Sequence, residues 1–124
     1  MNIDIESEII KVIDIEMKGL SLLMKNINIS VRDAVEVIFN CRGKVILTGM
    51  GKSGLVAKKI ASTMSSVGTP AIFMHPAEGM HGDLGIICVD DVVIAIGKSG
   101  ESSELNGVLP SIKSVGAKII GIMG

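Results

Sequence analysis

Three segments of this sequence carry side chains that could do chemistry, and two of them have the composition of an anion site. Residues 49–54 read GMGKSG and residues 97–104 read GKSGESSE, and each segment follows a short apolar run. At a strand-to-helix turn, glycines let the backbone approach a ligand, and the free N–H groups of the helix start point at it. Lys52, Ser53, Ser99 and Ser102 therefore predict a phosphate cradle, in which the serines either bind the anion or only cap their helices.

Residues 49–54 also fit two nucleotide-binding patterns, and the surrounding sequence argues against both. The spacing G-x-G-x-x-G after a strand is typical of dinucleotide sites, which need an acidic residue at the end of the second strand. This sequence has Met74-His75-Pro76 there, and Glu78 is the first acid. A phosphate-binding loop ending in Gly51-Lys52-Ser53 would need glycine at position 46, which is Ile46.

The third segment, residues 75–85, contains both histidines of the sequence, His75 and His81, together with Glu78 and Asp83. Imidazole and carboxylate groups suit zinc, although the spacing matches no common zinc motif. The same groups beside a phosphate site could move protons at neutral pH. A polar loop whose histidines only bond the backbone is the third interpretation.

The elements that must position these segments follow from the apolar pattern. Nearly continuous apolar runs at 44–48, 71–74, 92–96 and 118–122 predict strands covered on both faces, as in a parallel sheet. Helical patterns at 53–66 and 101–115 separate them, with Gly68 and Gly116 as stops and Pro110 inside the second. Leu55 and Val56 belong to the predicted buried face of the first. The fold class is α/β with a doubly wound parallel sheet, whose ligands bind at the carboxyl ends of the strands.

Residues 1–43 are predicted to form an N-terminal helical arm of the same domain as residues 44–124. Residues 5–27 have an apolar stripe and a second apolar face, which favours packing against another subunit. A second helix is expected to start at Ser30 and to end at Gly43. The stripe consists of Ile9, Ile13, Met17, Leu20, Met24 and Ile27.

Composition excludes several classes of protein. A balance of 12 basic and 13 acidic residues gives a net charge of -1, and aromatic residues make up 2% of the 124. We therefore expect neither nucleic acid nor membrane as a partner. Cys41 and Cys88 are too few for a disulfide framework, and no leader or membrane span is recognised, so the cytoplasm is the expected compartment.

Taken together, the motifs resemble the sugar isomerase (SIS) domain of arabinose 5-phosphate isomerases of the KpsF/GutQ type. They occur in the order GMGKSG (49–54), GTP (68–70), HPAE (75–78), HGDLG (81–85) and SGESSE (99–104). The resemblance runs from the N-terminal helices to Gly124. It implies a flavodoxin-like three-layer sandwich and a homotetramer. It also implies interconversion of D-ribulose 5-phosphate and D-arabinose 5-phosphate through an enediol, on the route to the Kdo sugar of lipopolysaccharide, without a cofactor.

The resemblance also assigns roles to residues. It places Lys52 and Glu104 at catalytic positions and a possible inhibitory zinc at His75. Glu104, taken by itself, is an ordinary first-turn carboxylate. The substrate-binding positions that it implies are Ser53, Gly68, Thr69, His75, His81, Ser99, Gly100 and Ser102.

Two departures from the family pattern bear on activity. Gly97-Lys98 replaces a small polar pair, which removes one hydroxyl from the phosphate site. The sequence also ends just after the fourth predicted strand. We therefore expect an incomplete domain without CBS modules, which lacks a further catalytic glutamate and histidine, with Glu78 and His81 as the nearest substitutes. The alternative function is a non-catalytic sugar-phosphate sensor or partner subunit.

Overall fold

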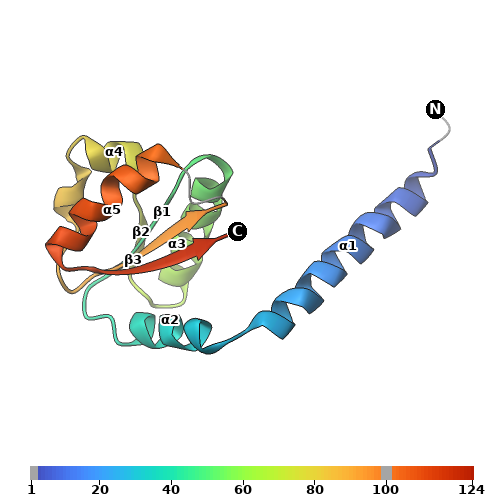
Figure 1. The fold of residues 1–124 in the computed structure, drawn as a ribbon, viewed down its shortest axis with the longest axis horizontal. Coiled ribbons are helices and arrows are strands. Elements are labelled where there is room, and N and C mark those ends of the chain that lie inside the picture. The colour runs from blue at the N-terminus through green and yellow to red at the C-terminus, as the bar shows by residue number, and fades with distance from the viewer. Residues whose placement is uncertain (1–2, 99–101) are drawn as a thin grey trace. The chain divides into compact units, whose positions relative to one another are not determined.

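The computed structural model describes residues 3–98 and 102–124, with the backbone alone at Asp83. The chain divides into two compact units, Met1–Asp33 and Ala34–Gly124. The predicted boundary after residue 43 stays a prediction. The helices and strands, drawn in Figure 1, are α1 (Ile5–Asn26), α2 (Ile29–Phe39), β1 (Val45–Gly49), α3 (Gly51–Ser66), β2 (Ala71–Phe73), α4 (Pro76–Met80), the 3-10 helix η1 (Asp83–Ile86), β3 (Val92–Gly97), α5 (Ser103–Val115) and β4 (Lys118–Met123).

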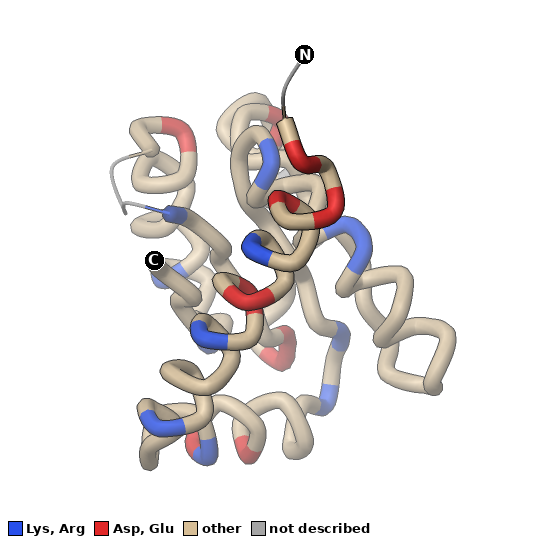
Figure 2. Tube along the Cα trace, turned by 90° about the vertical axis from the view of Figure 1, so that its right-hand side faces the viewer, with Lys and Arg blue, Asp and Glu red and all other residues tan. Residues whose placement is uncertain are grey.

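The first unit contains the long helix α1, as the apolar stripe predicts. Asp4 caps it, because the Asp4 carboxylate accepts the backbone N–H of Ser7 at 3.2 Å. Both acidic and basic residues occur along it (Figure 2), and Lys18 pairs with Asp14 at 2.6 Å. No residue of α1 is buried, and its large apolar side chains are between 53% and 69% exposed. In the part of the chain that the structure describes, no helix is both long enough and apolar enough to cross a membrane.

The second helix differs from its prediction at both ends. It begins at Ile29, and Asn28 rather than Ser30 supplies the acceptor, since Asn28 Oδ1 accepts the Ser30 N–H at 2.9 Å. It ends at Phe39 instead of Gly43. Asn40 donates its side-chain amide to the carbonyl of Glu36 at 2.8 Å and so satisfies a group at the helix end.

The four strands form one parallel sheet, as predicted, and the structure shows their order to be β2-β1-β3-β4. The crossover α3 joins β1 to β2 and packs on one face, and α5 joins β3 to β4 on the opposite face with α4 beside it (Figure 1). The winding therefore reverses between β1 and β3. In such a sheet, ligands bind at the carboxyl ends of the strands next to this reversal.

Each face of the sheet has its own apolar core. Ile46 and Val93 pack with the α5 residues Leu105, Val108 and Ile112. Val45, Leu47 and Ile94 face the other way, toward Ala57 and Ala61 of α3. This alternation confirms that β1 and β3 are covered on both faces.

The predicted buried face of α3 was wrong in part. Leu55 and Val56 are 69% and 51% exposed, whereas Gly54, Ala57 and Ala61 are buried against the sheet. Small residues on this face let the helix axis approach the strands closely, and the larger apolar side chains lie outside the contact.

The amino ends of β1 and β3 are joined by an ion pair whose carboxylate is buried and whose lysine is partly exposed. The Asp91 carboxylate is 2% exposed and accepts Lys44 Nζ at 2.7 Å. It also accepts the backbone N–H groups of Lys44 at 2.9 Å and Cys88 at 2.8 Å. A Cβ atom at Gly43 would collide with an Asp91 oxygen, which explains the glycine there. This edge is the one opposite to the carboxyl ends where a ligand is expected.

Candidate functional site

The turn between β1 and α3 has the shape that its glycines dictate. Gly51 has φ +54°, a left-handed conformation that side-chain-bearing residues rarely adopt, and nothing lies within 4 Å of its missing Cβ. A Cβ at Gly49 would lie 2.8 Å from the Ile96 carbonyl oxygen, and one at Gly54 would collide with the Gly49 carbonyl. The ends of β1, β3 and α3 therefore meet closely, with open space beside Gly51.

The start of α3 has no side-chain cap. Met50 stands at the N-cap position, and no side chain there accepts the first N–H groups of the helix. Lys52 is exposed and Ser53 half-buried in this first turn. Free N–H groups at a helix start, with the positive end of the helix dipole and a lysine beside them, favour an anion.

His75 lies at the carboxyl end of β2 and begins α4. Its Nδ1 accepts the Ala77 N–H at 3.2 Å, and its ring stands edge-on to Phe73 at 6.4 Å between centroids. Because Nδ1 accepts a hydrogen bond, the neutral imidazole carries its proton on Nε2 and can donate it to a ligand. A pocket of about 270 Å³ adjoins this ring, lined by Gly49, Gly51, Gly54, Leu55, Lys58, Phe73 and His75.

Glu104 lies in the first turn of α5, which Ser102 caps by accepting the Leu105 N–H at 3.3 Å. The pKa of Glu104 lies below its usual range because the carboxylate accepts its own backbone N–H and the hydroxyl of Ser103. Partial desolvation opposes this shift, while the Ser102 hydroxyl and the positive charge of a protonated His75 add to it. The Ser103 and Ser102 hydroxyls lie 3.1 Å and 3.3 Å from Glu104 Oε2. Glu104 is therefore an ionised carboxylate at neutral pH.

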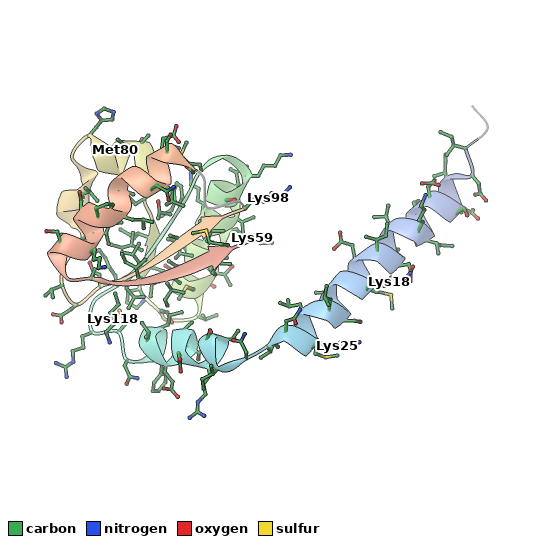
Figure 3. All side chains as sticks on the ribbon, in the orientation of Figure 1. Lys18, Lys25, Lys59, Met80, Lys98 and Lys118 are labelled. Carbon is green, nitrogen blue, oxygen red and sulfur yellow. The ribbon has the colours of Figure 1, made fainter. Side chains whose placement is uncertain are left out.

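The structure thus brings several predicted residues to one edge of the sheet. His75 lines the pocket against the start of α3, and its electrostatic influence contributes to the lowered pKa of Glu104. Lys52 and Ser53 belong to that same first turn of α3, and Ser102 contacts Glu104. Lys98, labelled in Figure 3, follows β3 at this edge and is exposed.

Not all of the predicted residues that the structure describes belong to this group. Gly68 and Thr69 precede β2, at the opposite edge, and line a different pocket of about 380 Å³ with Phe39 and Pro70. His81 ends α4 as an exposed residue. Ser99 and Gly100 lie outside the described residues. The substrate contacts of these positions stay predictions.

Zinc binding by His75 also stays a prediction. The hydrogen bond that His75 accepts opposes it, as follows from the position of the ring proton. A metal at Nε2 requires the ring proton to move to Nδ1, where it would face the Ala77 N–H that caps α4. Within residues 3–98 and 102–124, apart from the Asp83 side chain, no three His, Cys, Asp or Glu side chains gather to hold a metal.

Sequence reasoning missed some features of this edge. The predicted loop 75–85 contains α4 and η1, for which the signals were His75-Pro76 as a cap followed by proline at the first helical position. Ser103 was overlooked as a partner of Glu104, and Lys58 as a residue lining the pocket. Thr48, in β1, has a fully buried hydroxyl with no hydrogen-bond partner among the described residues, a feature that no sequence pattern signals.

Comparison with known proteins places this arrangement in a family. Residues 38–124 match the family model described as SIS domain. The chain is 47% identical over 114 residues to the arabinose 5-phosphate isomerase KdsD of Salmonella typhi, covering 92% of this chain and 35% of that protein. It is 50% identical over 103 residues to KdsD of Yersinia pestis, covering 83% of this chain and 31% of that one. The chain thus spans about a third of the length of these curated relatives.

A solved structure agrees with these matches. A protein of Escherichia coli CFT073 in complex with arabinose 5-phosphate superposes with a TM-score of 0.91 and 38% identity, covering 99% of this chain and 65% of that one. With the parallel sheet, the glycine turns and the order of the motifs, these matches establish that the chain belongs to the SIS domain family.

Proposed function

We propose that this chain binds a phosphorylated sugar at the carboxyl edge of its sheet and supplies part of an arabinose 5-phosphate isomerase site. The observation that carries the proposal is the uncapped start of α3, which lies beside the His75 pocket. Its support from relatives is the match to KdsD enzymes and to a protein solved with arabinose 5-phosphate.

The phosphate of the substrate would occupy the free N–H groups of α3, with the hydroxyls of Ser53, Ser99 and Ser102 as further donors. A phosphate dianion suits this position because the helix dipole and Lys52 both favour negative charge. Holding the phosphate fixes a small sugar, so that remote binding energy orients its reacting carbons.

The reaction would interconvert D-ribulose 5-phosphate and D-arabinose 5-phosphate by moving a proton between C1 and C2 through an enediol. Glu104 is an ionised carboxylate and would take the proton from carbon. The Lys52 ammonium and His75 Nε2–H would stabilise the oxygen on which negative charge develops. The proton would then return from Glu104 to the neighbouring carbon, while the proton of the C1 hydroxyl is lost and the former carbonyl oxygen at C2 gains one, so that the sum of atoms and charge is unchanged.

The proposal also covers the oligomeric state, the cellular compartment and the metabolic role of the protein. Because every large apolar side chain of α1 is exposed, we propose that copies of the chain associate through their N-terminal helices into a homo-oligomer, with a tetramer as the expected form. The enzyme would act in the cytoplasm, where its product would serve Kdo and lipopolysaccharide synthesis.

Two measurements test the function. Calorimetry should detect binding of D-ribulose 5-phosphate, and a coupled assay should detect formation of arabinose 5-phosphate. Lys52→Ala and Glu104→Gln should each lower turnover at least about 100-fold. Lys113→Ala and Asp90→Asn, exposed charges outside the candidate site and outside α1, serve as controls.

The outcomes separate the candidate functions. Binding with turnover that depends on Lys52 and Glu104 supports the isomerase. Binding without turnover favours a sugar-phosphate sensor or partner subunit. Absence of binding in a folded sample contradicts both.

A further inference from the structure

The pocket beside His75 contains a cation to which the predicted mechanism gives no role. Lys58 lines this pocket together with Gly51 and His75. Residues 51, 54, 55 and 58 recur at helical spacing and therefore share one face of α3. Long side chains on a helix lean back toward its N-terminus, and this tendency favours a Lys58 stem directed toward the first turn of α3.

The charges around this pocket favour an anion. Helix α3 has three lysines, Lys52, Lys58 and Lys59, and no acidic residue. None of the three forms an ion pair with another described residue. No carboxylate lines the pocket, whose other polar side chain is His75, with Nε2–H as its donor.

The shape of the pocket depends on its glycines. The position of a Cβ at Gly51 is empty to 4 Å, so a ligand can approach the backbone there. Leu55 and Phe73 supply apolar walls to the pocket, and Lys58 supplies its positive charge. A volume of about 270 Å³ leaves room for a small anionic group rather than a nucleotide.

We propose that Lys58 is a substrate-binding residue that contacts the phosphate group from the pocket side of α3 and sets affinity rather than the rate of the chemical step. This inference rests on the proposed function, since it deepens the same site. A contact made equally to bound substrate and transition state changes KM and leaves kcat unaltered.

Lys59, labelled in Figure 3, offers a matched control, because it is the adjacent lysine of the same helix and is absent from the lining of the pocket. Calorimetry on the full chain would compare the wild type, Lys58→Ala, Lys58→Arg and Lys59→Ala. The probes are inorganic phosphate, D-ribulose 5-phosphate and unphosphorylated D-arabinose. Thermal unfolding of each variant checks that the fold is retained.

We expect Lys58→Ala to weaken binding of both phosphate probes at least about fivefold, with partial rescue in Lys58→Arg. Lys59→Ala should change binding less than about twofold, and arabinose binding should not respond. The difference should shrink at 1 M salt, where charges are screened beyond about 3 Å. Where turnover is measurable, Lys58→Ala should raise KM and leave kcat within about twofold.

The results distinguish the two levels of inference. If the wild type binds no sugar phosphate, the proposed function fails. If the wild type binds and Lys58→Ala behaves as Lys59→Ala does, only the role of Lys58 is overturned. A loss confined to arabinose, or a fall in kcat alone, also overturns it.

Discussion

At the scale of single residues, Glu104 shows how a first-turn carboxylate acquires a defined protonation state. Its own backbone N–H and the Ser103 hydroxyl donate to it, with Ser102 as a weaker contact, and together they hold its pKa below the usual range. The Ser102 hydroxyl also caps α5. A phosphate that takes the Ser102 hydrogen would leave the cap intact and would free the carboxylate from one donor, so binding would make Glu104 a stronger base.

Ser103→Ala tests the hydrogen bonding of Glu104. Removing the hydroxyl takes away a donor to the ionised form, so the pKa of Glu104 should rise toward its ordinary value while Ser102 continues to cap α5. Carbon NMR of the side-chain carboxyl, followed over acid pH, measures the shift. Ser66→Ala, at the far end of α3, is the control. A pKa that stays the same or falls would contradict the assignment of Ser103.

The sequence was enough to select candidate site residues, but it did not predict their hydrogen-bond partners. Lys52, His75, Ser102 and Glu104 were identified because motifs and resemblance point to them. The contact between Ser103 and Glu104 depends on side-chain rotamers at the start of a helix. The unpaired hydroxyl of Thr48 depends on three-dimensional burial, which no local pattern encodes.

At the scale of elements, the glycines in the turn from β1 into α3 have two different structural roles. Gly51 supplies the left-handed conformation, whereas Gly49 and Gly54 permit close approach of helix and strands. A nucleotide-type pattern in the sequence therefore has a packing explanation at two of its three positions. The open side of Gly51 remains for a ligand.

Gly54→Ala tests the close approach. The added Cβ would collide with the Gly49 carbonyl, so the free energy of unfolding should fall by about 1–3 kcal/mol. Urea denaturation followed by circular dichroism measures it. Gly85→Ala, whose Cβ would meet nothing within 4 Å, should change stability much less. Equal losses in the two variants would show that steric contact at Gly54 is not the cause.

Element boundaries were predictable where sequence patterns are strong. All four strands and the parallel arrangement follow from continuous apolar runs separated by helical ones, and the sheet confirms them. The prediction of the buried face of α3 was wrong in part, because Leu55 and Val56 are strongly hydrophobic and were expected in the core. Glycine and alanine, which are only weakly hydrophobic, occupy the buried positions instead. Tertiary packing decides such cases.

At the scale of the whole sheet, the Lys44–Asp91 ion pair and the candidate site lie at opposite edges. Burial alone would raise the pKa of Asp91, but the hydrogen bonds from Lys44 Nζ and from the backbone of Lys44 and Cys88 outweigh it and lower the pKa below 3.8. The ionised carboxylate thus fastens the amino ends of β1 and β3. At the carboxyl edge, the first N–H groups of α3 have no side-chain cap.

The dependence of the unfolding free energy on acid pH tests the contribution of this ion pair. Because the folded pKa of Asp91 is depressed, its contribution is fully present above the unfolded value of 3.8 and is lost as pH falls through the lower folded value. Asp91→Asn should lower the unfolding free energy at pH 7 by about 2–4 kcal/mol and flatten its dependence on pH in that window. Denaturant unfolding between about pH 2 and about pH 7 measures the free energy of unfolding and its dependence on pH. This interval covers the pH range in which carboxylates titrate. Asp90→Asn, its exposed neighbour, is the control, and equal pH curves for Asp91→Asn and the wild type would exclude the ion pair as the cause.

The apolar side chains along α1 have a consequence for how this protein must be handled. If copies of the chain cover them mutually, unfolding releases separate molecules, and mass action shifts the transition with the amount of protein in the tube. Dilution alone would then lower the melting temperature of an unaltered sample. A melting temperature for this protein would have meaning only beside the concentration at which it was recorded.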